Sequence, residues 1–317
     1  MESDLWKITC PCSEIEVSED LCGQTDSIGT NALMAACFHG NVSLVQRLLD
    51  AGVNVNLTDK TNKTALVYAA GSKQIKIVPL LLRAGADVNV KDKYGWTALM
   101  FAIKFGNSKL ETLLLDAPAD VNIQTENHIT ALMFSVRFGT LDLVQRLLDK
   151  KADVNVQCAR GLTPLMYAVR FGTLDTVQIL LKAGASVYIK DEDGWTSLFH
   201  AIVFGTLDTV SLLLDNKAET KLVDINSLSP LTYAISSEKI ETVRLLLPYF
   251  KMIEKDSDGW TPLFYAVSSG NVEIVNLILG KNVDLNLIDA FGWTVLRHAQ
   301  DDNNAEIIQL LMDSVKV

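Results

Sequence analysis

The chain has 317 residues, 49% of them hydrophobic and 21% charged, so it can bury a large core and is not disordered by composition. Its net charge of −10 is uneven, because residues 1–28 hold seven acidic side chains and one lysine, a net of −6, which leaves −4 for the remainder. This nearly neutral body with an acidic start argues against general binding to nucleic acid or to anionic membranes.

Residues 1–25 form an acidic leader that holds three of the five cysteines, Cys10, Cys12 and Cys22. An odd number of cysteines favours free thiols in a reducing compartment, so we expect the protein in the cytoplasm, with the nucleus as the alternative. Cys37 and His39 could complete a zinc site with the leader, but Cys-Pro-Cys with loose partners matches no common ligand spacing. We therefore expect no metal. Whether the leader is an ordered cap or a free tail stays open.

From residue 26 onward the chain consists of copies of one unit. The stretch TALMFSVRFG at Thr130–Gly139 follows TALMFAIKFG and precedes TPLMYAVRFG and TSLFHAIVFG. Aligned on the T-x-L pattern, the unit starts are 33 residues apart, except at the seventh interval, which is 32. Such an array grows in one dimension. The starts are Asn31, Thr64, Thr97, Thr130, Thr163, Thr196, Ser229, Thr261 and Thr294.

Each unit contains the same predicted elements: a turn such as DKYG, a helix opened by T-x-L, a glycine, and a second amphipathic helix such as TLDLVQRLLDK. Endings such as GADVN, with Gly85, predict a left-handed cap for the second helix. One such unit cannot bury its apolar stripe alone, whereas stacked copies bury a continuous core. The sequence predicts an all-α solenoid with units at about 26–58, 59–91, 92–124, 125–157, 158–190, 191–223, 224–255, 256–288 and 289–317.

This period and pattern resemble the ankyrin-repeat family, whose unit is a β-turn finger plus two helices with a T-P-L-H-x-A signature. The resemblance implies a concave groove, lined by the fingers and inner helices, that binds other proteins. The signature histidine is absent from all nine units, so we expect apolar packing to replace most of its hydrogen bonds. The residues in its place are Met34, Val67, Met100, Met133, Met166, Phe199, Thr232, Phe264 and Arg297.

Three prolines mark departures from the regular unit. Pro79 falls in a second helix and predicts a kink there. Pro118 replaces a capping glycine, so that cap must be built differently. Pro248 accompanies the shortened seventh interval, where any bend or shift of register is expected.

The resemblance also indicates which side chains face the groove. Those in the second to fifth units carry a net charge of +6, and those in the sixth to ninth carry −5, so the groove is predicted to be electrically polarised. Aromatic and arginine side chains are enriched at interface hot spots, and arginine can fork onto carboxylates. An acidic-hydrophobic protein segment is therefore the expected partner. The predicted partner-binding residues are Lys93, Tyr94, Trp96, Lys104, Phe105, Arg137, Phe138, Arg160, Arg170, Phe171 and Phe204.

Four phenylalanines of this set recur once per repeat and form a predicted ladder. Each could instead pack against the next repeat, and the sequence leaves these two interpretations open, although the neighbouring basic residues favour binding. The tryptophans of the GWT motifs are expected to pack finger against finger. They are Trp96, Trp195, Trp260 and Trp293.

No catalytic set is indicated, because the four histidines lie in different units and no phosphate-binding or dinucleotide glycine pattern occurs. The sequence predicts a non-enzymatic adaptor or scaffold, a monomer without cofactor or membrane contact. One alternative is an enzyme or enzyme effector that acts through the cysteine-containing leader, although this is short for an independent site. The other is single-stranded nucleic-acid binding through the basic half of the groove, which the acidic half and the leader oppose.

Overall fold

The computed structural model describes residues 24–281 and 283–314. The cysteines of the leader therefore lie outside the described residues. The chain divides into two compact units, Met1–Ala159 and Arg160–Val317. Among the described residues the regular elements are helices, with two isolated β-bridges and no sheet. The all-α repeat solenoid is confirmed.

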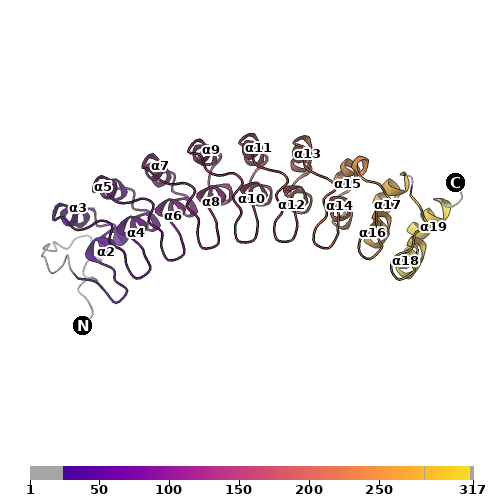
Figure 1. Ribbon diagram of the computed structural model, residues 1–317, viewed down its shortest axis with the longest axis horizontal. Coiled ribbons are helices and arrows are strands. Elements are labelled where there is room, and N and C mark those ends of the chain that lie inside the picture. The colour runs from indigo at the N-terminus through magenta and orange to yellow at the C-terminus, as the bar shows by residue number, and fades with distance from the viewer. Residues whose placement is uncertain (1–23, 282, 315–317) are drawn as a thin grey trace. The chain divides into compact units, whose positions relative to one another are not determined.

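Unit 1 contains two rows of helices, an inner row beside the fingers and an outer row (Figure 1). Each inner helix packs against the next inner helix and against its own outer helix. The inner helices are α2 (Ala32–His39), α4 (Ala65–Gly71), α6 (Ala98–Lys104) and α8 (Ala131–Phe138), and the outer ones are α3 (Val42–Asp50), α5 (Val78–Arg83), α7 (Ser108–Asp116) and α9 (Leu141–Asp149).

Unit 2 repeats this arrangement. Its inner helices are α10 (Pro164–Phe171), α12 (Ser197–Phe204), α14 (Pro230–Ser236), α16 (Pro262–Ser269) and α18 (Val295–Asp301). Its outer helices are α11 (Leu174–Lys182), α13 (Leu207–Asp215), α15 (Ile240–Leu246), α17 (Val272–Leu279) and α19 (Ala305–Ser314), and a 3-10 turn η2 (Leu247–Tyr249) follows α15.

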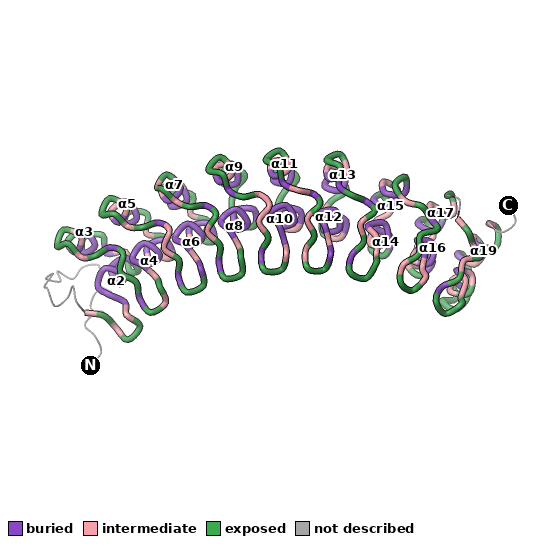
Figure 2. Tube along the Cα trace, viewed as in Figure 1, coloured by how far each residue is buried: buried purple, intermediate pink, exposed green. Residues whose placement is uncertain are grey.

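The T-x-L motif begins the inner helices and supplies their buried face. The Thr97 side chain caps α6 by accepting a hydrogen bond from the Met100 backbone N–H at 3.4 Å. The inner helices are buried and the finger tips exposed (Figure 2). At the position of the family histidine, Met100, Met133 and Phe199 are at most 1% exposed. Apolar packing at this position is confirmed.

Neighbouring fingers are joined by backbone hydrogen bonds, which the shortened seventh interval interrupts. In unit 1 the Lys93 N–H donates to the Thr61 carbonyl at 2.8 Å, and in unit 2 the Ile225 N–H donates to Asp193 at 3.2 Å. Among the described residues, Ser257 makes no equivalent bond to the finger before it. The predicted shift of register therefore lies here, where Pro248 lies in η2.

The other two prolines have different outcomes. The predicted kink at Pro79 is wrong, because α5 begins at Val78 and Pro79 lies in its first turn, where a backbone N–H has no helical partner to lose. The helix is shortened instead. The prediction for Pro118 is confirmed, since Ala117, the residue that caps the end of α7, is extended rather than left-handed.

Candidate functional site

In each unit the candidate site lies on the face formed by the fingers and the carboxyl ends of the inner helices, here named the finger face of that unit. Phe138 is the last residue of α8, and Phe171 and Phe204 end α10 and α12. The glycine after Phe138, Gly139, has φ of −94°, so a left-handed conformation is not what it supplies. A Cβ on Gly139 would lie 2.8 Å from the Ser135 carbonyl oxygen, so the close approach of the turn requires glycine.

The four phenylalanines of the ladder are partly exposed rather than buried against the next repeat. In unit 1, Phe105 is 39% exposed and Phe138 is 44% exposed. In unit 2, Phe171 is 44% exposed and Phe204 is 48% exposed. Each ring therefore presents apolar area to solvent at one equivalent position of its repeat.

Cationic side chains of unit 1 lie over aromatic rings of this face. The Arg137 guanidinium carbon is 5.0 Å from the Phe138 ring centroid, and Lys104 Nζ is 4.8 Å from that of Trp96. Lys93 Nζ lies 4.7 Å from the ring of Tyr94, which is 52% exposed. Such contacts hold the cationic groups in place over the rings of this face. The sequence reasoning missed Lys73, whose Nζ is 5.7 Å from the Phe105 ring.

The tryptophans of the GWT motifs pack differently from the prediction. The Trp96 ring centroid lies 4.6 Å from Phe134 of α8 and 5.1 Å from Phe101 of α6. In unit 2 the Trp195 ring lies 4.9 Å from Tyr233 of α14. The predicted finger-to-finger packing is therefore wrong, because these rings fill the step between a finger and two inner helices. Trp96 remains half-buried on the finger face.

Unit 2 places Arg160, Arg170 and Phe204 in one pocket of about 190 Å³. The Arg170 guanidinium carbon is 4.4 Å from the Phe204 ring centroid and 5.4 Å from that of Phe171. Three acidic residues of the sixth finger complete the lining. The full set is Arg160, Leu162, Arg170, Asp191, Glu192, Asp193, Trp195, His200 and Phe204.

A buried hydrogen bond between the sixth finger and α12 forms the floor of this pocket. His200 Nε2 lies 2.8 Å from Asp191 Oδ2, and both side chains are almost fully buried. Burial alone would raise the pKa of Asp191, but hydrogen bonds from His200, from the backbone of Trp195 and from that of Asp193 lower it below its usual value. The pair therefore holds an ionised carboxylate at the base of the finger.

We name this contact the finger clamp, and the sequence reasoning missed it. Its ring residue is four positions after the T of T-x-L and nine after the finger aspartate, which is the signal that could have revealed it. In unit 1, Tyr68 donates to Asp59 at 2.6 Å, and burial followed by this bond raises the pKa of Tyr68 to about 12. The clamp recurs in unit 2 at Tyr233–Asp224, Tyr265–Asp256 and His298–Asp289.

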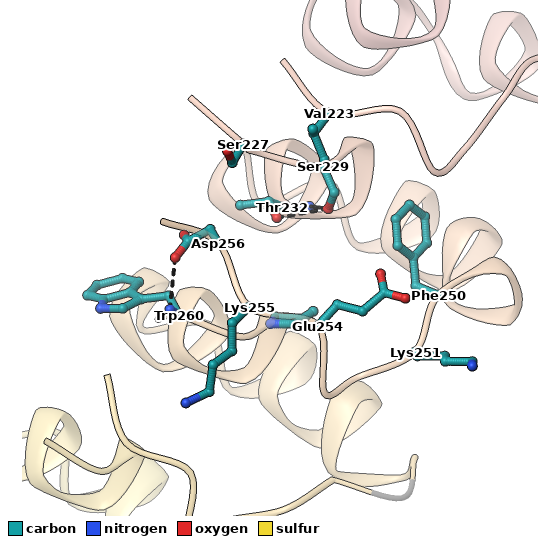
Figure 3. A pocket seen from close by; sticks show the side chains of 11 residues that line it. Val223, Ser227, Ser229, Thr232, Phe250, Lys251, Glu254, Lys255, Asp256 and Trp260 are labelled. Carbon is teal, nitrogen blue, oxygen red and sulfur yellow. Dashed lines mark hydrogen bonds between the residues drawn. The ribbon is translucent and has the colours of Figure 1, made fainter. Parts of the chain in front are cut away.

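A second pocket opens in unit 2 where the backbone hydrogen bond between neighbouring fingers is missing (Figure 3). Its walls are the seventh and eighth fingers, the starts of α14 and α16, and the irregular segment after η2. Phe250, Glu254 and Lys251 come from that segment, and the hydroxyls of Ser229 and Thr232 lie 2.9 Å apart. Lys255 Nζ donates to the Ile288 carbonyl at 2.7 Å, so this cation braces the ninth finger. The pocket follows from the missing residue of the repeat.

Within residues 24–281 and 283–314, no three His, Cys, Asp or Glu side chains are placed to hold a metal ion. Cys37 is fully buried, and burial raises the pKa of its thiol far above the usual value. The leader cysteines Cys10, Cys12 and Cys22, for which the sequence predicts no metal, lie outside these residues. No helix in the described part of the chain is long and apolar enough to cross a membrane.

Comparison with known proteins identifies the repeat. A family model of three ankyrin repeats matches residues 13–92, 33–125, 99–191, 132–224 and 198–289. The chain belongs to the ankyrin-repeat family. A search of the curated proteins found no match to this ankyrin-repeat protein.

Every predicted partner-binding residue of this ankyrin-repeat protein lies within a matched segment. Nine of them are exposed, and Trp96 and Arg170 are half-buried because they stack on neighbouring rings. Ankyrin repeats are generally protein-interaction modules, and their frame leaves side chains such as these to choose the partner. In unit 1 the Lys104 ammonium lies over the Trp96 ring, and in unit 2 Arg160 and Arg170 line the same pocket.

Proposed function

We propose that the protein is a non-enzymatic scaffold that binds a protein segment along its finger face. The observation that carries this proposal is the recurrence of a partly exposed phenylalanine beside a stacked cation, as at Arg137–Phe138 and Arg170–Phe171. A ring that already stacks on a cation offers its remaining area to a partner without losing much side-chain entropy. Such pairs suit binding hot spots.

The charges of this face support a partner that carries acidic and hydrophobic side chains. The Arg170 guanidinium, which stacks on rings, can fork onto a carboxylate with its edge. The apolar part of the partner would cover the phenylalanine rings. An extended chain or a helix presents both kinds of side chain at regular spacing and so fits a surface that repeats.

A quadruple variant tests the proposal. Arg137, Phe138, Arg170 and Phe171 are replaced together by serine in the full chain, and partners are captured from native cell extract with the wild type alongside. We expect partner capture to be lost while circular dichroism and the unfolding midpoint stay close to those of the wild type. Unchanged capture by a folded variant would disprove the assignment of the finger face.

The outer helices offer a matched control. Leu141 and Leu174 are 39% and 40% exposed, and Lys150 and Lys182 are exposed cations near the ends of the same two helices. Replacing these four by serine removes the same number of apolar and charged side chains from the outer helices and their ends. This variant is expected to capture partners as the wild type does.

We also infer that the protein acts as a monomer, without a cofactor, in the cytoplasm or the nucleus. The odd number of cysteines supports a reducing compartment. Light scattering during size-exclusion chromatography measures the mass, and a value near 34.8 kDa is expected. Twice that mass would show that a second copy competes for one of the faces.

A further inference from the structure

The pocket of unit 2 lies where the charge of the finger face changes sign. In chain order, Arg160 and Arg170 are the last basic residues of the predicted site, and Glu192 and Asp193 follow on the next finger. All four line the same pocket. We name the two arginines the basic wall of this pocket and the two acids its acidic wall.

The two arginines of this pocket have unused hydrogen-bonding capacity. Among the described residues, neither Arg160 nor Arg170 forms an ion pair. Arg170 is held between the rings of Phe204 and Phe171, so its guanidinium is oriented without spending its N–H donors. A half-buried guanidinium in this state is suited to a carboxylate from outside.

The acidic wall does not neutralise the arginines from within. Asp191 accepts from His200 and from the backbone N–H groups of Asp193 and Trp195, so its carboxylate is satisfied inside the finger. The side chains of Glu192 and Asp193 are exposed and turned to solvent. A ligand with negative charge alone would be repelled by these two acids, whereas a ligand with both charges would match both walls.

We propose that this pocket receives an acid–base pair of side chains from the partner segment. The partner carboxylate, from aspartate or glutamate, binds Arg170 and Arg160, and a nearby lysine or arginine of the same segment lies against Glu192 and Asp193. The inference rests on the proposed function and refines it. The acidic-hydrophobic segment carries a basic residue where it meets the sixth finger.

A phage-displayed library of random twelve-residue peptides, selected on the immobilised full chain, tests both walls at once. The wild type is expected to enrich peptides that contain an acidic and a basic residue close together beside an aromatic one. The R160Q/R170Q variant should lose the acidic enrichment and keep the basic one, and E192Q/D193N should do the reverse. The most enriched peptide, measured by fluorescence anisotropy, should bind R160Q/R170Q at least about tenfold more weakly.

A matched control uses an ion pair on an outer helix. Arg244 and Glu241 of α15 lie 3.5 Å apart and are largely exposed, so R244Q/E241Q should select the same peptides as the wild type. If both pocket variants select the wild-type peptides with unchanged affinity, the pocket assignment is overturned while the proposed function stands. If the wild type selects peptides that lack an acidic and a basic residue close together, the pocket assignment is likewise overturned while the proposed function stands. Failure of the wild type to select any peptide would overturn both proposals.

Discussion

Two kinds of turn join the inner and outer helices, and they differ in what the backbone demands. In the fourth to sixth repeats the turn glycine is extended, with φ of −92° at Gly172 and −89° at Gly205. In the third and eighth repeats the equivalent residues, Gly106 and Gly270, have φ of 64° and 70°. Inner helices that begin with the same T-x-L motif therefore end in two different turn conformations, one extended and one left-handed.

The comparison shows that a recurring glycine can have two separate causes. In the left-handed turns, Lys73 and Glu238 occupy the same position with positive φ, so glycine is favoured there without being required. Before the extended turns the inner helix ends at Phe138, Phe171 or Phe204, and before the left-handed turn at Gly270 it ends at the equivalent Ser269. The stacking of the terminal ring does not depend on the exit, because Phe138 stacks on Phe134 at 6.3 Å beside an extended turn and Phe105 stacks on Phe101 at 6.4 Å beside a left-handed one.

Among the contacts of the fingers and turns, the largest expected effect belongs to the finger clamp, which occurs beside both kinds of turn. His200→Ala in the sixth repeat leaves the carboxylate of Asp191 buried without its ring partner and should cost about 3 kcal/mol. Tyr233→Phe in the seventh repeat removes only a hydroxyl from Asp224 and should cost about 1 to 2 kcal/mol. Denaturant unfolding of both variants measures the two losses of unfolding free energy. A smaller loss for His200→Ala would show that the clamp is not a stabilising contact there.

Alanine substitutions in the turns separate the two causes of glycine directly. A Cβ on Gly205 would lie 2.8 Å from the Ala201 carbonyl oxygen, which is backbone and cannot move aside, so Gly205→Ala should destabilise the chain by about 2 kcal/mol. Gly270 faces open space apart from one side chain at 3.8 Å, so Gly270→Ala should cost only the strain of positive φ, about 1 kcal/mol.

A third turn variant completes this test. Gly270→Asn should be better tolerated than Gly270→Ala, because asparagine adopts positive φ more readily. The measurement is again the unfolding midpoint. If Gly205→Ala proves as mild as Gly270→Asn, the distinction between the turns fails.

The sequence was sufficient for the frame and for the place of the ladder, because both depend on a strict period. It did not distinguish Gly139 from Gly106, since the sequence reads FG at both and the difference arises from how closely the chain approaches the preceding turn. The finger clamp was missed because its two members, such as Asp191 and His200, belong to separate motifs that meet only in the folded repeat. The direction of the tryptophans was wrong for the same reason, as contacts across a step depend on three-dimensional placement.

Acid should lower the stability of repeats with either kind of turn. The folded-state pKa values of Asp59 and Asp191 are lowered, because hydrogen bonds from the clamp and the finger backbone outweigh burial, which acts in the opposite direction. Their stabilisation is complete above the unfolded pKa of about 3.9 and is lost as the pH falls through the folded values. Unfolding midpoints measured from pH 7 to about 2.5 should fall below about pH 4.

The Asp191→Asn variant isolates one carboxylate in this titration. It should be less stable than the wild type at pH 7 and should show a flatter loss of stability in acid, because the amide does not titrate. The control is Asp258→Asn on an exposed finger tip, which should follow the wild-type curve. Parallel curves for Asp191→Asn and the wild type would show that the clamp carboxylate does not contribute to acid unfolding.

The smallest expected effect on stability belongs to the ladder itself. Phe138→Ser, beside an extended turn, and Phe105→Ser, beside a left-handed one, should each cost about 1 kcal/mol or less, because much of each ring already faces solvent. Phe199→Ala, at a fully buried position, should cost about 4 kcal/mol and serves as the reference. A cost for Phe138→Ser near that reference would show that the ring holds neighbouring repeats together, and the reading of the ladder as a binding surface would then fail for the extended turns.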